Sequence, residues 1–280
     1  MFVPVFAIAA LSLDLILGYG ALVSFGHAAF VGLGAYAVGI LGAHGINDAL
    51  VALPVALGAA ALFAFATGAI SLRTKGVYFI MITLAFGQMA YFTASSLAPY
   101  GGDDGLTLRV RSTFAGLPVL QNDRALYYVC LACLLGAYLL CRALVASRFG
   151  RVYRGTRENP QRLETIGFHV YRFQLVAYVI AGMLAGLAGF LLANATDFVS
   201  PAFMSWQRSG ELLIMVIFGG MGTLNGAIVG AAAFLLTEEW LSGFTEHWKV
   251  IFGPVLVLVA VFARGGLLGV AARLRGIGRG

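Results

Sequence analysis

Residues 50–70 read LVALPVALGAAALFAFATGAI and contain no charged side chain. A helix of about 20 apolar residues is long enough to cross the hydrocarbon core of a bilayer. Similar apolar runs recur along the 280 residues, of which 60% are hydrophobic and only 11% are charged. Soluble globular domains carry about 25% charged residues. The composition therefore excludes an ordinary soluble protein and predicts an all-α, polytopic integral membrane protein.

Apolar periodicity divides the chain into about nine segments. They lie at roughly 2–17, 27–42, 50–70, 77–98, 126–146, 173–193, 209–221, 224–242 and 250–264. The first and seventh are short for a full crossing. Glycines follow both of them, at Gly18, Gly20 and Gly26 and at Gly219, Gly220 and Gly222. We therefore predict one transmembrane domain over 1–280, made of transmembrane or partly spanning helices with discontinuous, glycine-rich breaks.

The basic residues predict an orientation, because cytoplasmic loops carry the Lys/Arg excess in membrane proteins. An outside N-terminus places thirteen of the eighteen basic residues inside. These are Arg73, Lys75, Arg142, Arg148, Arg151, Arg154, Arg157, Arg162, Arg172, Arg264, Arg273, Arg275 and Arg279. An odd number of spans then predicts a cytoplasmic C-terminus. The formal charge of +6 follows from these flanks, and with no basic stripe interleaved with aromatics we expect no nucleic-acid partner.

Two loops are long enough to have a function of their own. The outside loop, about 99–125, contains the turn-rich run Gly101–Gly105 and is either a connection or a docking surface for an external partner. The inside loop, about 147–172, has arginines at every third position from Arg148 to Arg154. Pro160 is able to start a short helix there. That helix would lie among lipid headgroups or insert into a groove of a cytoplasmic partner.

The sequence contains no recognisable catalytic or metal motif. Its only lysines are Lys75 and Lys249, so no G-x-x-x-x-G-K-[ST] phosphate loop exists, and H-E-x-x-H and G-x-S-x-G are also missing. Cys130, Cys133 and Cys141 lie in one apolar run without a nearby histidine, which indicates small apolar residues. We expect a transport subunit that is not an enzyme and binds no metal or cofactor. Any ATP would be used by partner chains.

Several blocks of sequence resemble the branched-chain amino-acid ABC transporter permeases of the LivM type. They are Ser24–Phe30 with Gly32, Gly34, Ala35 and Tyr36; Gly76–Phe79 with Thr83–Gly87; Gly101–Leu106; Gly150-Arg151, Arg157-Glu158 and Gly167; and Ser209, Glu211, Leu213, Met215-Val216 and Gly219–Thr223. Together they extend from about residue 11 to 270. Three departures stand out. Members usually carry a further apolar segment upstream of the first block, and two alanines where this chain has Arg162 and Leu163. Near the C-terminus they often have Pro-x-Gly-Leu, where this chain reads Ala263-Arg264-Gly265-Gly266-Leu267.

The resemblance implies a permease subunit of a binding-protein-dependent importer in the bacterial inner membrane. Such importers pair two homologous permease chains with two cytoplasmic ABC ATPase subunits, and an extracytoplasmic substrate-binding protein delivers the substrate. The implied substrates are branched-chain, hydrophobic amino acids. The family also contains relatives for urea and short amides. An ion-coupled secondary transporter acting alone is the alternative of a different class.

Four polar residues in or beside apolar spans are candidates for the substrate pathway, and each also has a structural interpretation. They are Ser24, His27, Thr83 and Glu211. Ser24 and His27 sit at a glycine-rich break, where transporters place polar groups, although either could satisfy a freed backbone carbonyl. Thr83 could bond to its own helix. Glu211 could cap the seventh segment, and Asp14 could pair with a group in the break at 18–26.

Two further sets of residues complete the expectations. The ATPase coupling loop would use Arg157, Glu158, Arg162, Glu164 and Gly167. Gly182 and Gly186, and separately Gly222 and Gly226, are four residues apart, which predicts close helix packing on one face in each set.

Overall fold

The computed structural model describes residues 2–108, 110–114, 119–243, 253–254 and 265–269. Its α-helices are α1 (Phe2–Leu17), α2 (His27–Ala43), α3 (Ala49–Ser71), α4 (Val77–Ser95), α5 (Asp123–Ala146), α6 (Arg148–Glu158), α7 (Pro160–Thr165), α8 (Val170–Thr196), α9 (Trp206–Gly219) and α10 (Leu224–Ser242). Two short strands, β1 (Leu106–Thr107) and β2 (Phe198–Val199), pair antiparallel. Single 3₁₀ turns lie at Ala98–Tyr100, Gly102–Asp104, Val119–Gln121 and Pro201–Met204.

The all-α, polytopic architecture is confirmed, whereas the number of nine spans is not. Eight of the nine predicted segments coincide with a helix, and the ninth, 250–264, lies almost wholly outside the described residues. Within the described part, α3, α4, α5 and α8 are long and apolar enough to cross a membrane. The pair α9 and α10 qualifies together but bends by 117° at its break, and α1 and α2 are shorter apolar helices.

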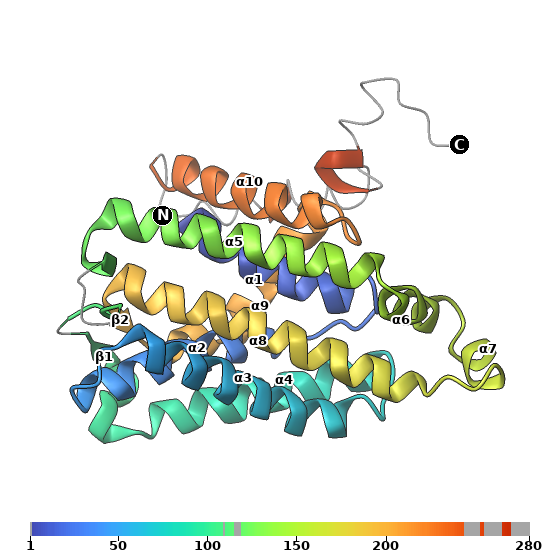
Figure 1. Cartoon of the computed structure of the whole chain (residues 1–280), viewed down its shortest axis with the longest axis horizontal. Helices are drawn as coiled ribbons and strands as arrows, with labels where there is room; N and C mark the ends of the chain where they lie inside the picture. The colour runs from blue at the N-terminus through green and yellow to red at the C-terminus, as the bar shows by residue number, and fades with distance from the viewer. Residues whose placement is uncertain (1, 109, 115–118, 244–252, 255–264, 270–280) are drawn as a thin grey trace.

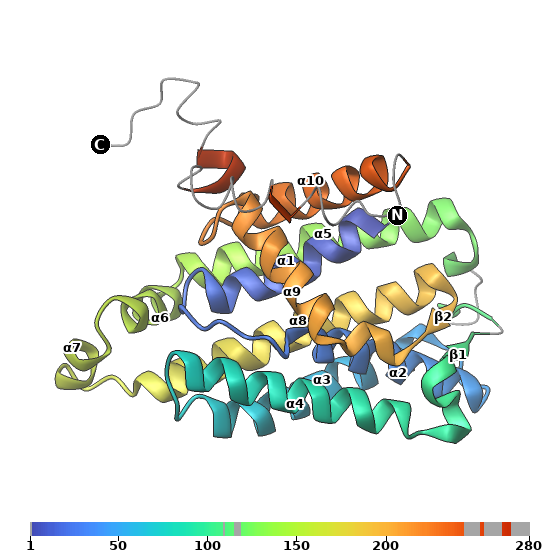
Figure 2. The same cartoon turned by 180° about the vertical axis from the view of Figure 1, so that it is seen from behind.

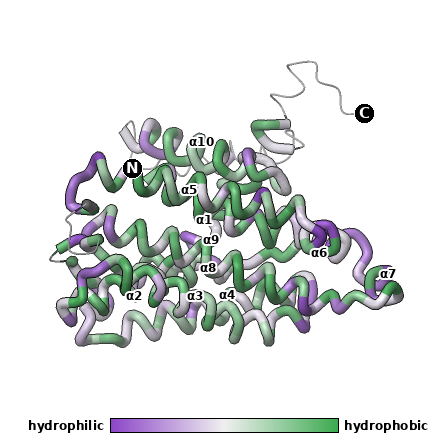
Figure 3. The backbone as a smooth tube through the Cα atoms, viewed as in Figure 1, coloured by the Kyte–Doolittle hydropathy of each residue, from purple (hydrophilic) through white to green (hydrophobic). Residues whose placement is uncertain are grey.

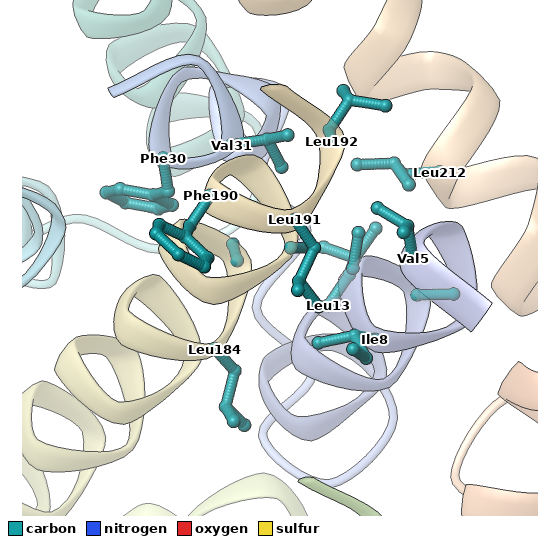
Figure 4. Close-up of a cluster of buried hydrophobic side chains, with 14 of the residues drawn as sticks. Val5, Ile8, Leu13, Phe30, Val31, Leu184, Phe190, Leu191, Leu192 and Leu212 are labelled. Carbon is teal, nitrogen blue, oxygen red and sulfur yellow. The ribbon is translucent and has the colours of Figure 1, made fainter. Parts of the chain in front are cut away.

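Helix α1 lies in the interior of the bundle, where α5, α8, α9 and α10 pack against it, while α3 and α4 lie further away, beyond α8 (Figures 1 and 2). Its side chains Ile8, Leu11 and Leu13 are fully buried. Figure 4 shows that Leu13 and its neighbours on α1 face Leu191 of α8. In the outer helices, by contrast, large apolar side chains point away from the protein, with Leu62 of α3 and Tyr78 of α4 more than 70% exposed. Lipid contact explains such exposure in a membrane protein.

Small residues let α3 and α8 approach closely. Ala56, Ala60 and Ala64 of α3 are fully buried, one turn apart. A Cβ added to Gly182 of α8 would come within 2.6 Å of the Ala64 Cβ, and one added to Gly186 would come equally close to that of Ala60. Contacts of this kind are typical of helix pairs in membranes. Gly182 and Gly186 therefore pack against this chain's own α3.

The two ends of the bundle differ in character (Figures 1 and 3). At one end, β1 and β2 lie near the N-terminus, and Arg111 pairs with Asp197 at 2.8 Å and with Asp123 at 2.5 Å. These hydrogen bonds raise the pKa of Arg111 above its usual value. The opposite end carries α6 and α7, the hydrophilic helices of the inside loop. The sequence interpretation included a helix near Pro160 but missed α6.

Candidate functional site

The first helix break, residues 18–26 between α1 and α2, crosses the interior without regular structure. Bonds from other helices hold its far end. The Phe25 amide donates to the Thr83 hydroxyl of α4 at 3.3 Å, and the Ala28 amide donates to the Ser209 hydroxyl of α9 at 3.0 Å. Buried amides need such partners because no water can replace them in an apolar interior.

The second helix break, residues 220–223 between α9 and α10, turns the chain by its own backbone angles. Gly220 has φ +120° and Gly222 has φ +77°, conformations that glycine adopts without a steric penalty. The Thr223 hydroxyl donates to the Gly220 carbonyl at 2.7 Å and tightens the turn. Gly222 therefore lies in this turn and not on a helix face, which differs from the prediction that paired it with Gly226 along one helix.

Gly226 and Gly230 do lie on α10, where they allow α9 to approach. A Cβ on Gly226 would come within 3.0 Å of the Gly219 carbonyl oxygen, and one on Gly230 would come within 2.8 Å of the Gly219 Cα. The second glycine set thus packs the two arms of the α9–α10 hairpin. The prediction placed Gly222 and Gly226 on one helix face, although it also counted Gly222 among the glycines of the second break.

The two breaks touch each other at the α6 end of the bundle. Asp14, in the last turn of α1, is fully buried, and its Oδ1 accepts a hydrogen bond from the Gly222 amide at 2.8 Å. Gly18 lies beside this contact, and a Cβ there would overlap the Asp14 carboxylate and the Gly222 backbone. The sequence suggested a partner for Asp14 in the first break, whereas the structure places it in the second.

Helix α6 contacts the first break directly. The Arg157 Nη1 donates to the Gly18 carbonyl, and the buried Tyr153 ring lies so close to Gly20 that a Cβ on Gly20 would overlap its hydroxyl. Burial raises the pKa of Tyr153 well above its usual value, so its phenol stays neutral. Two side chains of α6 thus connect the exposed end of the molecule to both breaks, since Gly18 abuts Gly222.

The predicted pathway residues line different parts of this region. His27 begins α2, is fully buried, and has its Nε2 2.8 Å from the Ser12 hydroxyl of α1. Ser12 itself donates to the Ala9 carbonyl at 2.7 Å, so the histidine nitrogen acts as the donor to Ser12. Ser24 is buried within the first break, and Thr83 faces it from α4 while also donating to the Ile80 carbonyl at 3.0 Å.

Glu211 lies apart from this group, near the other end of the bundle. It pairs with Arg208 at 2.6 Å, one turn earlier on α9. The N-cap of α9 is Ser205, whose hydroxyl accepts from the Arg208 amide at 3.4 Å. The structure therefore brings Ser24, His27 and Thr83 together around one break and leaves Glu211 in an ion pair.

The predicted coupling residues also fall into two groups, one that contacts the first break and one that is exposed. Arg157 reaches Gly18, while Glu158, Arg162, Glu164 and Gly167 are exposed on or beside α7. Asn159 caps α7 by accepting from the Arg162 amide at 3.0 Å. Leu163 faces Gly155 of α6, which leaves Ile166 64% exposed and Phe168 38% exposed. The surface at this end, which we call the α7 patch, thus carries exposed apolar side chains, Ile166 and Phe168, as well as the exposed charged residues Arg162 and Glu164.

The described residues contain no group of three or more His, Cys, Asp or Glu side chains placed to hold a metal ion. The geometry is that of two interlocked helix breaks joined to an exposed helical loop. Such discontinuous helices are typical of transporters.

Comparison with known proteins agrees with this geometry. Residues 1–260 match the family described as branched-chain amino acid transport system / permease component. The chain belongs to this family. It is 27% identical to the high-affinity branched-chain amino acid transport system permease protein LivM of Escherichia coli (strain K12), over 94% of this chain and 68% of that protein.

Two further relatives show the breadth of the family. The chain is 31% identical to the probable branched-chain amino acid transport permease protein LivH of Methanocaldococcus jannaschii, over 51% of this chain and 47% of that protein. It is 30% identical to the autoinducer 2 import system permease protein LsrC of Enterobacter sp. (strain 638), over 74% of this chain and 60% of that protein. No solved structure matches the chain. The recognised family and the apolar helices establish a multi-pass membrane transport component.

Proposed function

We propose that this permease is the translocating subunit of a binding-protein-dependent ABC importer for branched-chain, hydrophobic amino acids. Its partners are a second homologous permease, two cytoplasmic ABC ATPases and an extracytoplasmic binding protein. The whole of 1–280 forms one permease domain in the bacterial inner membrane. The end with α6 and α7 faces the cytoplasm, as does the C-terminus, in agreement with the positions of the basic residues.

The observation that carries this proposal is the link from α6 to both helix breaks. A force applied to the exposed α7 patch reaches α6, and Arg157 passes it to the Gly18 carbonyl. Gly18 in turn abuts Gly222, to which Asp14 is hydrogen-bonded. A transporter driven by another chain needs such a connection between an outer surface and its discontinuous helices. Since the chain has no phosphate loop, ATP hydrolysis on separate subunits would supply that force.

In this mechanism, movement of α6 shifts the first break relative to α2, α4 and α9. The residues that hold the break, Thr83 and Ser209, would exchange their bonds to the backbone as the pathway opens on one side and closes on the other. Ser24 and His27 are then the polar groups that a passing solute meets. Glu211 would act through Arg208 near the other end.

The test is reconstitution of the complex. The tagged chain would be purified from membranes in mild detergent, and its co-purifying chains identified by mass spectrometry. We expect a second permease and two ATPases. Proteoliposomes with the binding protein outside and ATP inside should then accumulate leucine. Uptake of urea or a short amide instead would assign a different substrate, and uptake by the chain alone along an ion gradient would contradict the ABC mechanism.

The placement of the coupling surface has a separate test. The double variant Arg162→Ala with Glu164→Ala should reduce association with the ATPases while membrane insertion is unchanged, because both side chains are exposed on α7. The single variant Arg124→Ala, at an exposed arginine of the opposite end, is the control. If the double variant binds the ATPases normally, α7 is not the coupling surface.

A further inference from the structure

A cavity of about 590 Å³ lies at the end of the bundle opposite α6 and α7. The N-terminal half of α1, the start of α2, the C-terminal part of α8, the first two turns of α9 and the C-terminal part of α10 line it. This volume falls within the range of about 300–1,000 Å³ that is typical of small-molecule sites. None of the predicted pathway residues lines it, although Glu211 is bonded to a residue that does.

The inner wall of this cavity is aliphatic. It is formed by Val5 of α1, Val31 of α2, Leu192 of α8 and Leu212 of α9, each no more than 6% exposed. In Figure 4 these four side chains, from four different helices, lie close together. Such a wall is suited to a branched aliphatic side chain and offers nothing to a small polar solute such as urea.

The lining of the cavity also carries charges of both signs. Arg208 of α9 and Glu238 and Glu239 of α10 line it. The Nη1 of Arg208 donates to Glu211 at 2.6 Å, which fixes the guanidinium at the wall. A guanidinium has five N–H donors in a planar fork that matches a carboxylate, so one such bond does not exhaust it.

We propose that this cavity binds a zwitterionic, apolar amino acid directly. Arg208 receives the α-carboxylate, Glu239 attracts the α-ammonium, and the aliphatic wall takes the side chain. The inference rests on the proposed function and deepens it, because it gives the permease its own selectivity for amino acids over uncharged amides.

The test is binding of L-leucine to the purified complex in phosphatidylglycerol nanodiscs, without the binding protein, measured by saturation-transfer NMR at millimolar leucine. The wild-type complex should give a signal. Arg208→Gln should lower it at least fivefold, and Leu212→Trp, which fills the cavity, should abolish it. Arg124→Gln, at an exposed arginine near the same end, should leave it unchanged. Leucinamide, which lacks the carboxylate, should bind wild type weakly and lose little affinity on Arg208→Gln.

The outcomes separate the site from the proposed function. A wild-type complex that imports leucine but gives no Arg208-dependent signal would overturn the site alone. One that binds leucine in an Arg208-dependent way yet does not import it would support the site and overturn the proposed function. If Arg208→Gln lowers the signals of leucine and leucinamide equally, Arg208 has only a structural role and the proposal is overturned. Loss of the leucine signal in phosphatidylethanolamine nanodiscs would assign the cavity to a zwitterionic lipid headgroup.

Discussion

The two helix breaks are both rich in glycine, but they are held in different ways. The first, 18–26, depends on side chains of other elements: Thr83 from α4 and Arg157 from α6 bond to the break, and Ser209 from α9 bonds to Ala28 at the start of α2 just after it. The second, 220–223, is shaped largely by its own left-handed glycines and by Thr223. The first is therefore sensitive to movement of its neighbours, whereas the second is a preformed turn. The Asp14 carboxylate and the contact of Gly18 with Gly222 join the two.

The largest expected effect comes from separating the two breaks. In Gly18→Val, the added side chain would overlap the Asp14 carboxylate and the Gly222 backbone. Because backbone cannot move aside as a flexible side chain can, we expect a loss of stability of at least about 3 kcal/mol, the upper end of typical overpacking costs. The yield and thermal midpoint of the purified protein measure it. Gly136→Val, at an open position on α5, should be tolerated. Equal stability of both variants would show that the breaks do not touch.

The next effect concerns the carboxylate between them. Asp14→Leu would leave the Gly222 amide without its acceptor at a partly buried position, which costs about 1–3 kcal/mol for an unsatisfied group. Asp14→Asn keeps an acceptor oxygen and is the matched control. We expect the thermal midpoint to fall clearly in the leucine variant and much less in the asparagine variant. The same fall in both would indicate that the charge, and not the hydrogen bond, matters.

A third prediction tests whether the contact of α6 with the first break is needed for transport. Arg157→Gln shortens the side chain that bonds to the Gly18 carbonyl. A hydrogen bond from a charged group contributes about 1.5–3 kcal/mol, so ATP-driven uptake should fall about tenfold or more while the ATPases remain bound. Arg154→Gln is the control, since Arg154 bonds to the Val145 carbonyl at the α5–α6 corner instead. Identical uptake in the two variants would show that the Arg157–Gly18 contact does not transmit movement from α6 to the first break.

The smallest effect is expected at the far end of the first break. Thr83→Val removes the hydroxyl that accepts from the Phe25 amide at 3.3 Å, a loss of about 1 kcal/mol for a long neutral bond. Thr93→Val on the same helix loses only a bond to the Met89 carbonyl, four residues earlier. Thermal unfolding should separate the two variants slightly, and uptake should change only in Thr83→Val. No difference between them would mean that Thr83 merely bonds within α4.

Much of the helical framework was predicted, but helix α6 was missed although the sequence carries signals for it. Its sequence, RFGRVYRGTRE, has an arginine at every third position, and these arginines are exposed while Gly150, Tyr153 and Thr156 are buried. The helix is therefore amphipathic, and the sequence interpretation noted the arginine spacing without recognising this pattern. The capping residues were a usable signal that the sequence interpretation did not apply. Ser147 accepts from the Gly150 amide at 3.2 Å and starts α6, and Asn159 precedes Pro160 at the start of α7.

The alanine repeat of α3 is a second signal that was present in the sequence. Ala52, Ala56, Ala60 and Ala64 recur every fourth residue and are all buried, while Leu62 and Phe65 are exposed. This spacing marks one helix face. It could have predicted the packing stripe that meets Gly182 and Gly186, and with it the fact that the partner is a helix of the same chain.

The sequence by itself determined the solvent of this protein, the position of most helices, the presence of two glycine-rich interruptions and the family. Composition and periodicity suffice for these because each is a local property of a short window. The tertiary structure alone decided that Asp14 bonds to Gly222, 208 residues away, that Gly222 belongs to a turn, and that Arg157 reaches Gly18. Such contacts depend on how the helices pack around α1, and no local pattern specifies which buried polar group meets which.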